Sequence, residues 1–152
     1  MKQTYINIIA NIEKLHRLSL EVIKAYLDRQ NIHDINNVQC FILYNIGEAR
    51  LTVGEISNRG YYMGSNVTYN LKKMIESGYI DQEQSDHDRR SSHVKLSPKG
   101  MAFYKNFEKL FELHIKNLAT NGVTEESLKN LLKNLHKLEA FWGFMVMHDI
   151  HH

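Results

Sequence analysis

The sequence has few of the residues and segments that define several protein classes. Cys40 is the only cysteine in 152 residues, so the chain forms no internal disulfide and gives no sign of an oxidising compartment. Pro98 is the only proline, which leaves most of the chain free to form long helices. No apolar run approaches the roughly 20 residues that span a bilayer, and the N-terminus lacks the pattern of a secretory signal. We therefore expect a cytoplasmic protein with no membrane partner.

The chain also has little net charge. Its 19 Lys and Arg against 17 Asp and Glu leave a formal charge of +2, which is too small to identify a nucleic-acid partner by itself. The charge is unevenly distributed, because residues 50–105 contain nine Lys and Arg against six Asp and Glu. The hydrophobic content of 43% suits one compact domain, or a small domain with extensions. The middle of the chain is therefore mildly basic, whereas its ends are nearly neutral.

The spacing of apolar residues predicts a mainly helical protein. Apolar side chains recur at steps of three and four residues through most of the chain. Asn36 with Gln39, and Thr52 with Glu55, have the spacing of capping boxes at helix starts. The expected helices cover about residues 4–30, Asn36 to Gly47, Thr52 to Gly60, Ser65 to Ser77, Ser97 to about Ala119, and Thr124 onward.

The helix expected at residues 65–77 has two chemically distinct faces. Its apolar side chains share one side of a helical wheel: Val67, Leu71, Met74 and Ile75. The rest of its surface offers hydroxyls, amides and ammonium groups, from Ser65, Asn66, Thr68, Tyr69, Asn70, Lys72 and Lys73. Such groups suit the base edges and phosphates of DNA, although a solvated helix face has the same pattern. The short helix expected just before favours DNA, because the two together predict a helix-turn-helix.

A second cationic feature follows that helix. Tyr79–Gln84 and Ser92–Ser97 predict a β-hairpin with Arg89 and Arg90 at its tip. Arginines on such a hairpin suit a narrow minor groove, where the negative potential of DNA is concentrated. A nearby carboxylate such as Asp88 can hold an arginine in one geometry through hydrogen bonds. The alternative is a solvated turn of mixed charge.

The middle of the chain resembles the winged helix-turn-helix core of the MarR family of bacterial transcriptional regulators. The motifs that carry the resemblance are the short EIS helix, the run SNVTYNLKKMIESGYI, the wing with Asp88 and Arg90, and the closing HVKLSPKG. The core of the match runs from about Ile35 to Gly100. One departure is Tyr69, which stands where the family frequently has arginine.

The resemblance implies a fold, a layout and partners. The implied fold is mainly α (α+β): a winged helix-turn-helix with a two-stranded β-hairpin wing and long N- and C-terminal dimerisation helices. The implied divisions are an N-terminal dimerisation helix (residues 1–34), a DNA-binding lobe (35–97) and C-terminal dimerisation helices (98–152). The implied DNA contacts include the helix at residues 65–77, Asp88, Arg89 and Arg90. The implied partners are double-stranded DNA and a second copy of the chain.

The last expected helix carries a heptad seam of large apolar residues. Its members are Leu128, Leu131, Leu135, Leu138, Trp142 and Met145. We expect this seam to form part of the dimer interface. The alternative is a seam buried within a single chain.

The resemblance also implies a place for a small molecule. Members of the family commonly bind small, often aromatic, ligands between their dimerisation helices and DNA-binding lobes. The corresponding segments carry His16, Arg17, Tyr26, Cys40 and Tyr44, which are the candidate contacts for an aromatic or phenolic effector. Each of these residues also fits an ordinary packing role, and the apolar surroundings of Cys40 are typical of an inert buried thiol.

Other kinds of site have little support. The nine histidines include no H-E-x-x-H pattern, and a second cysteine is lacking, so we expect no metal. Without a Gly-rich phosphate loop or a G-x-S-x-G motif, we expect neither enzyme activity nor a cofactor. The leading hypothesis is a sequence-specific, ligand-responsive transcriptional regulator that acts as a homodimer on a pseudo-palindromic operator. The alternatives are a non-specific architectural DNA-binding protein and a small-molecule-binding protein without a DNA function.

Overall fold

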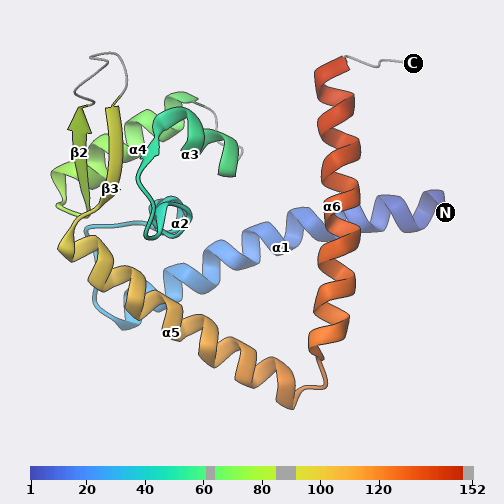
Figure 1. Ribbon diagram of the computed structural model, residues 1–152. Helices are drawn as coiled ribbons and strands as arrows, with labels where there is room; N and C mark the ends of the chain where they lie inside the picture. The colour runs from blue at the N-terminus through green and yellow to red at the C-terminus, as the bar shows by residue number, and fades with distance from the viewer. Residues whose placement is uncertain (61–63, 85–91, 149–152) are drawn as a thin grey trace. The chain divides into compact units, whose positions relative to one another are not determined.

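The computed structural model describes residues 1–60, 64–84 and 92–148, and the side chains of all of these except Gly64 and Ser65. The chain divides into two compact units, Met1–Asn106 and Phe107–His152. The elements in chain order are α1 (Lys2–Arg29), α2 (Asn37–Ile46), β1 (Leu51–Thr52), α3 (Val53–Gly60), α4 (Gly64–Glu76), β2 (Ile80–Gln84), β3 (Ser92–Leu96), α5 (Pro98–Thr120) and α6 (Glu125–His148) (Figure 1). None of the helices in these described ranges combines the length and the apolar character needed to cross a lipid bilayer.

The predicted fold class is confirmed. The described chain is mostly helical and has one small antiparallel sheet, and the pair α3 and α4 is followed by the hairpin of β2 and β3. Figure 1 shows the two strands of the hairpin side by side, with α3 and α4 next to them. The division of the chain at residues 34/35 and 97/98 stays a prediction.

The sheet contains one strand more than the predicted hairpin. Its strand order is β1-β3-β2, and β2 pairs with β3 from Ile80 opposite Leu96 to Gln84 opposite Ser92. The added strand, β1, places Leu51 opposite Val94. A strand of two residues is too short to show the alternation of apolar and polar side chains from which strands are recognised in a sequence. β1 therefore pairs with the edge of β3 that the hairpin leaves free, and the sequence pattern does not predict this strand.

Local hydrogen bonds explain where several helices begin. The Asn36 side chain accepts from the backbone N–H of Gln39 at 2.8 Å, and the Gln39 side chain accepts from the backbone N–H of Asn36 at 3.1 Å. This is the reciprocal capping box expected from the sequence. Thr52 Oγ1 accepts from the backbone N–H of Glu55 at 3.2 Å, and so caps α3. These side chains satisfy amide groups that have no partner within their own helix.

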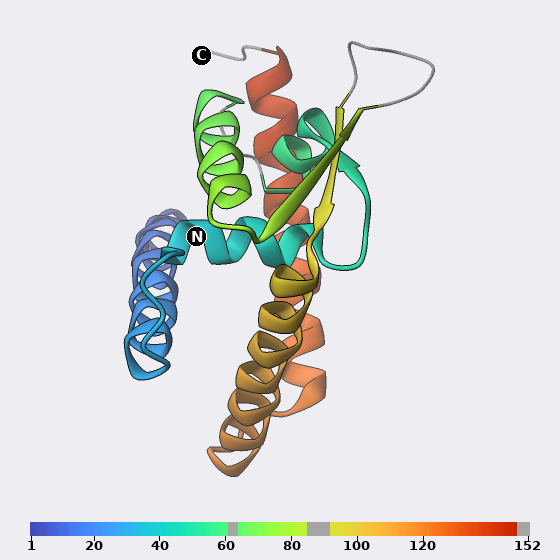
Figure 2. The same ribbon diagram turned by 90° about the vertical axis from the view of Figure 1, so that its left-hand side faces the viewer.

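The core of the first unit lies between α2, α4, the sheet and the C-terminal end of α1. The buried residues of α1 are Ile23, Tyr26 and Leu27, all near its last turns. In α4, Val67, Leu71 and Met74 are buried. Figure 2 shows α2 running across the base of the lobe, beneath α4 and the sheet. Burying each large aliphatic side chain stabilises the fold by about 1.5–3 kcal/mol, so this arrangement fixes which face of α4 remains on the surface.

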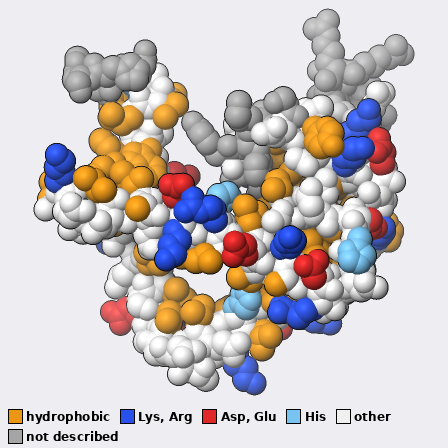
Figure 3. All heavy atoms as spheres, turned by 180° about the vertical axis from the view of Figure 1, so that it is seen from behind, with side chains coloured by type: hydrophobic (Ala, Val, Ile, Leu, Met, Phe, Trp, Pro, Cys, Tyr) orange, Lys and Arg blue, Asp and Glu red, His pale blue; other side chains and the backbone are white. Residues whose placement is uncertain are grey.

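The second unit contains the rest of α5 and the whole of α6. Thr124 Oγ1 accepts from the backbone N–H of Ser127 at 3.1 Å, which caps α6 as expected. α6 has no buried residue, and its seam residues Leu128, Leu131 and Leu135 are all exposed. Figure 3 shows hydrophobic side chains gathered on the surface at the upper left of that view. The other three seam residues, Leu138, Trp142 and Met145, are half-buried, so both the dimer seam and the intramolecular seam stay predictions.

Candidate nucleic-acid interface

The outward face of α4 carries five of the seven side chains of this helix that the sequence predicted for contact with DNA. The exposed members of the predicted set are Asn66, Thr68, Tyr69, Lys72 and Lys73. The burial of the opposite face holds this polar face on the surface, because rotating the helix would expose its apolar side chains. The side chain of Ser65 lies outside the described residues, so its predicted contact is untested.

Tyr69 is the most prominent side chain on this face. It is 61% exposed, and Lys73 Nζ lies 5.9 Å from the centre of its ring, at the limit of a cation–π contact. Lys73 Nζ also lies 3.7 Å from a carboxylate oxygen of Glu76. The phenol offers an apolar ring for a thymine methyl group and a hydroxyl for a base edge or phosphate. The charge of Lys73 is partly offset by Glu76.

Asn70 differs from the other predicted contacts. It is half-buried, and its carbonyl oxygen accepts from Gln39 Nε2 at 3.2 Å. Its amide nitrogen donates to the backbone carbonyl of Asn66 at 2.8 Å. Asn70 is therefore bonded at both ends to the protein, whereas the sequence pattern grouped it with residues that face outward.

The strands of the sheet carry an ion-pair cluster centred on Glu83 of β2. Glu83 Oε2 lies 3.0 Å from Arg50 Nε, and Glu83 Oε1 lies 2.8 Å from Lys95 Nζ. The hydrogen bond from Lys95 and the charges of Lys95 and Arg50 hold the pKa of Glu83 below its ordinary value. Two of the cations that make residues 50–105 basic are thus paired with one carboxylate.

The predicted wing residues Asp88, Arg89 and Arg90 fall in residues 85–91, outside the described ranges. Their contacts with DNA stay a prediction. The structure does describe the two strands that carry this segment, and β2 begins within a few residues of the end of α4.

A groove of about 410 Å³ lies between α4 and the hairpin. Thr68 and Lys72 line it from α4, and Gln82 and Val94 line it from the two strands. A polar side chain, an ammonium group and apolar walls thus meet beside the exposed face of α4. This places Thr68 and Lys72 on the side of α4 that faces the hairpin.

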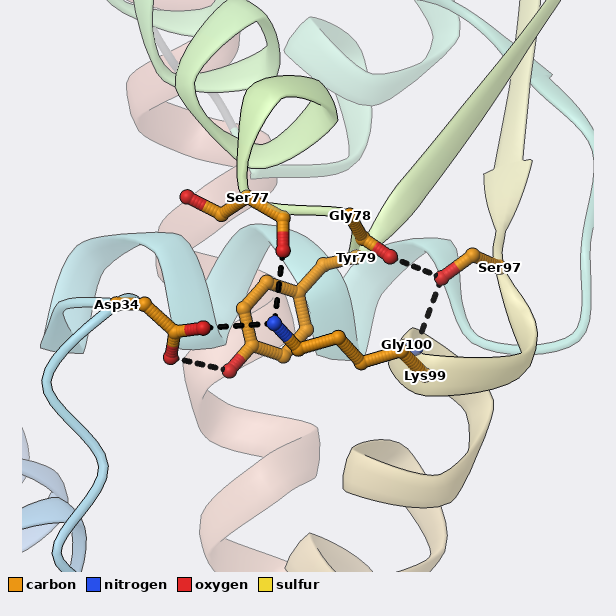
Figure 4. Close-up of polar contacts among 7 residues, drawn as sticks. All are labelled: Asp34, Ser77, Gly78, Tyr79, Ser97, Lys99 and Gly100. Carbon is orange, nitrogen blue, oxygen red and sulfur yellow. Dashed lines mark hydrogen bonds and ion pairs between the residues drawn. The ribbon is translucent and has the colours of Figure 1, made fainter.

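The C-terminal end of α4 is held by a polar cluster of seven residues, which we call the Asp34 cluster (Figure 4): Asp34, Ser77, Gly78, Tyr79, Ser97, Lys99 and Gly100. Tyr79 donates its hydroxyl to Asp34 Oδ1 at 2.6 Å, and Lys99 Nζ donates to Asp34 Oδ2 at 2.7 Å. The same ammonium group donates to the Ser77 carbonyl at 2.8 Å and lies 4.4 Å from the centre of the Tyr79 ring. The cluster joins the α1–α2 loop, the end of α4 and the first turn of α5.

The charges within the Asp34 cluster shift two pKa values in opposite directions. Burial raises the pKa of Asp34, but the hydrogen bonds from Lys99 and Tyr79 and the charge of Lys99 outweigh burial, so that its pKa lies below the ordinary value. Burial raises the pKa of Tyr79 strongly, and the hydrogen bond to Asp34 and its negative charge add to this effect. Tyr79 therefore remains a neutral donor and Asp34 a charged acceptor at neutral pH.

The chain passes unusually close to itself at this cluster. A Cβ atom at Gly100 would lie 2.1 Å from the carbonyl oxygen of Tyr79, so no larger residue fits without displacement of the backbone. Ser97 Oγ donates to the Gly78 carbonyl and accepts from the backbone N–H of Gly100 at 3.0 Å. These contacts fasten the start of α5 to the segment that follows α4.

The five candidate effector residues have different environments. His16 and Arg17 are exposed on α1, where Arg17 pairs with Glu13. Tyr26 and Cys40 are buried, and burial raises the pKa of the Cys40 thiol to about 12. The ring of Tyr44 lies 5.3 Å from that of Tyr104. None of the five lines the groove beside α4.

A second groove is also free of the candidate effector residues. It has a volume of about 420 Å³, lies where α1 leads into α2, and is lined in part by Lys24, Leu27 and His33. Among the described residues, no three His, Cys, Asp or Glu side chains are grouped so that they could hold a metal ion.

The contacts through Gln39, Asp34, Tyr79 and Lys99 were not predicted from the sequence. The capping pattern identified Gln39 as a local partner of Asn36, but it said nothing of the distant Asn70. The bonds from Tyr79 and Lys99 to Asp34 span 45 and 65 residues. A search for buried or half-buried polar residues next to predicted helix ends could have marked these positions, but not their partners.

Comparison with known proteins places this geometry in a family. A family model described as MarR family matches residues 33–91. The exopolysaccharide II synthesis transcriptional activator ExpG of Rhizobium meliloti is 33% identical over 140 residues, which cover 92% of this chain and 72% of that protein. The HTH-type transcriptional regulator TcaR of Staphylococcus aureus is 24% identical over 136 residues, which cover 86% of this chain and 87% of TcaR.

Solved structures share the fold. FabT of Streptococcus pneumoniae, in complex with DNA, aligns with a TM-score of 0.74 and 22% identity over 93% of this chain and 99% of that chain. MepR of S. aureus, also in a complex with DNA, aligns with a TM-score of 0.70 and 20% identity over 91% of this chain and 97% of that chain. At these identities the likeness supports the fold, while the identity with ExpG is high enough to indicate family membership.

Proposed function

The chain belongs to the MarR family of DNA-binding transcriptional regulators, and from this premise we propose that it acts as a homodimer on a pseudo-palindromic operator in the cytoplasm, under the control of a small molecule. The observation that carries the proposal is the orientation of α4. Its apolar face is buried in the lobe, and its polar face lies on the surface beside a β-hairpin. A helix held in this way can enter the major groove while the hairpin reaches along the duplex.

Each part of this surface has a proposed role. Asn66, Thr68 and Tyr69 contact base edges, and Lys72 and Lys73 contact phosphates. Arg89 and Arg90 insert into the neighbouring minor groove, where a narrow A·T-rich segment favours arginine. Asp88 holds the arginines in position through charge-assisted hydrogen bonds. The phosphate contacts provide affinity and the base contacts provide the preference for one sequence.

The exposed apolar side chains of the long helices support a homodimer. Leu131 is 55% exposed on α6, and α1 and α5 carry further exposed apolar residues such as Ile9, Leu15 and Ile115. Contiguous exposed apolar surface in a water-soluble chain marks an interaction surface. Two joined copies of α4 would address two half-sites about one helical turn apart, which a single α4 cannot do.

The proposed effector is a small aromatic or phenolic molecule. It changes DNA affinity by binding more tightly to one arrangement of the two recognition helices than to the other, because only differential binding shifts such an equilibrium. The candidate contacts remain His16, Arg17, Tyr26, Cys40 and Tyr44. The burial of Tyr26 and Cys40 requires a ligand to displace other side chains in order to reach them.

Selection of DNA by the pure protein tests the proposal. Fragments of the genome of the source organism are incubated with the protein, and the bound fragments are sequenced. We expect enrichment of one pseudo-palindromic site, with an affinity at least about 1,000-fold above that for random duplex at physiological salt. A ratio below about tenfold would instead favour an architectural protein that binds DNA without reading it.

Arg90→Ala tests the wing. We expect operator affinity to fall about tenfold or more, because a buried cationic contact with the duplex is lost. The dimer and its melting temperature should be unchanged, as measured by sedimentation and circular dichroism. Full operator affinity in the double variant Arg89→Ala/Arg90→Ala would exclude the wing from DNA binding and favour a protein that only binds small molecules.

A further inference from the structure

Gln39 is a buried polar residue with both ends of its side-chain amide in use. It lies in the first turn of α2 and is 7% exposed. Its oxygen accepts from the backbone N–H of Asn36 at 3.1 Å, and its nitrogen donates to the oxygen of Asn70 at 3.2 Å. Gln39 thus connects the capped start of α2 to the middle of α4, across 31 residues of sequence.

The bond from the backbone N–H of Asn36 determines which group is donor and which is acceptor in every other hydrogen bond of this link. The backbone N–H of Asn36 can only donate, so the Gln39 oxygen must face it and the Gln39 NH2 group must face Asn70. Asn70 must then present its oxygen to Gln39. Its own NH2 group is left to donate to the Asn66 carbonyl, as observed at 2.8 Å. Reversing either amide would bring two donors or two acceptors together.

The hydrogen bonds of Asn70 limit its part in the recognition of DNA by α4. An asparagine recognises adenine by using its oxygen and its NH2 group together. In Asn70, both groups are already bonded within the protein, and the residue is half-buried. Asn66 lies one helical turn earlier and has an exposed side chain. The two asparagines are therefore suited to different tasks.

We propose that Asn70 is a positioning residue, which together with Gln39 fixes the rotation of α4 against α2, and that Asn66 is the asparagine that reads a base. The proposal rests on the proposed function of α4 as the recognition helix. It reassigns one residue of the predicted DNA-contact set and adds Gln39, which makes no contact with DNA. Losing the link leaves α4 folded but lets it adopt more than one rotation, which weakens binding to the operator.

A double-mutant cycle on operator affinity tests this link. The probe is the duplex that the wild-type chain enriches most strongly from a randomised pool, at one fixed salt concentration. The variants are Gln39→Met, Asn70→Ala and the double variant. We expect each single change to weaken binding about fivefold, the equivalent of one ordinary hydrogen bond, and the double variant to bind no more weakly than the weaker single variant. A double variant weakened about 25-fold, the product of independent effects, would overturn the link.

Asn66→Ala is the matched control, because it removes the same kind of side chain from the same helix. In combination with Gln39→Met its effect should be multiplicative, since a base contact at Asn66 does not pass through Gln39. The cycle also cancels the loss of the Asn36 contact, which Gln39→Met causes in both backgrounds. Strong coupling between Gln39 and Asn66 as well would contradict the division of tasks between the two asparagines.

Selection from a randomised pool separates positioning from base reading and does not depend on the folding of Gln39→Met. With Asn70→Ala, the enriched sequence should be that of the wild type although affinity is lower. With Asn66→Ala, the preference at one position of each half-site should relax. A changed preference or an unchanged affinity in Asn70→Ala would overturn the proposal. Failure of the wild-type chain to enrich any sequence would instead overturn the proposed function itself.

Discussion

The DNA-binding lobe and α6 differ in how far their apolar side chains are buried. In the lobe, residues such as Ile42, Ile56 and Val67 are completely buried, and α4 buries most of its apolar face. α6 has 24 residues, more than α2 and α4 together, yet none of them is buried. The hydrophobic effect acts on both regions alike, so the difference supports the proposal that the long helices pack against a second copy of the chain.

This contrast also separates two kinds of positioning. α4 is held from several sides by the same chain: by its buried face, by Gln39 near its middle and by the Asp34 cluster at its end. A recognition surface must be rigid to select one DNA sequence, because a surface that can move is able to fit several sequences. For α6, we propose that contacts with a second copy of the chain set its position.

The largest effect expected from this contrast concerns the dimer. The double variant Leu131→Glu/Leu135→Glu should be monomeric at micromolar concentration, because dimerisation would bury four carboxylates. Operator affinity should fall at least about 100-fold, since the two half-sites are no longer bound together. Analytical ultracentrifugation and a DNA-binding titration measure the two effects.

The matched control is Asn130→Glu/His136→Glu, which adds the same charge to α6 away from the seam. This variant should remain a dimer with nearly normal operator affinity. A Leu131→Glu/Leu135→Glu variant that still sediments as a dimer would remove α6 from the interface.

The next largest difference is expected in the free energy of unfolding when two glycines, Gly100 and Gly143, are replaced by alanine. Gly100→Ala should lower the free energy of unfolding by about 3 kcal/mol, because the new Cβ would lie 2.1 Å from the Tyr79 carbonyl oxygen. Gly143→Ala in α6 meets nothing within 4 Å and should raise it by about 0.5–1 kcal/mol. Urea denaturation at one protein concentration compares them. A loss at Gly143 similar to that at Gly100 would mean that α6 is closely packed after all.

A smaller difference is expected between two lysines, Lys99 in the lobe and Lys129 in α6. Lys99→Ala should cost about 1 kcal/mol of folding free energy, since Lys99 bonds both Asp34 and the Ser77 carbonyl. Lys129→Ala breaks a pair with Glu125 in which both side chains are more exposed, and should change the free energy by less than about 0.5 kcal/mol. Thermal melts of both variants beside the wild type provide the measurement.

The effect of Lys99→Ala should also depend on pH in a definite direction. The pKa of Asp34 in the folded chain lies below its ordinary value of 3.8, so folding favours the charged form. The stabilisation is fully present above that ordinary value and is lost as the pH falls through the lower folded pKa. The difference between wild type and Lys99→Ala should therefore shrink under acid conditions; a difference that grows as the pH falls would contradict the assigned pair.

The smallest effect is expected at Cys40. Burial raises the pKa of its thiol to about 12, so very little reactive thiolate exists at neutral pH. Treatment of the native protein with hydrogen peroxide should leave operator affinity unchanged within about twofold, and alkylation of Cys40 should proceed only as the lobe unfolds. A peroxide-induced loss of DNA binding that dithiothreitol reverses would show instead that Cys40 is an oxidant sensor.

Much of the lobe could be predicted because its signals are local. A capping box depends on residues three positions apart, so Asn36 and Gln39 marked the start of α2. The period of apolar side chains identified the buried face of α4, and with it the exposed positions of Tyr69, Lys72 and Lys73. The strands of the hairpin were recognised from their alternation, to within one residue at each end. Each of these features is determined by neighbours along the chain.

The features that were missed depend on contacts between distant residues. β1 exists only because Leu51 and Thr52 lie against β3. Asn70 had an outward position by periodicity, but the side chain of Gln39 reaches it from another helix. Asp34 looked like one residue of a polar loop until Tyr79 and Lys99 converged on it. A polar side chain shows its type in the sequence but does not show its partner.

The order of apolar and polar residues by itself determined that the chain forms long helices, a helix-turn-helix and a hairpin, and which face of α4 is polar. Backbone geometry turns such an order directly into faces, because a helix repeats every 3.6 residues and a strand every two. Which polar side chains remain available on that face, and which are bonded within the protein, follows from the packing of the helices and the sheet. That choice depends on hydrogen-bond partners brought together by packing, and distance along the chain does not encode it.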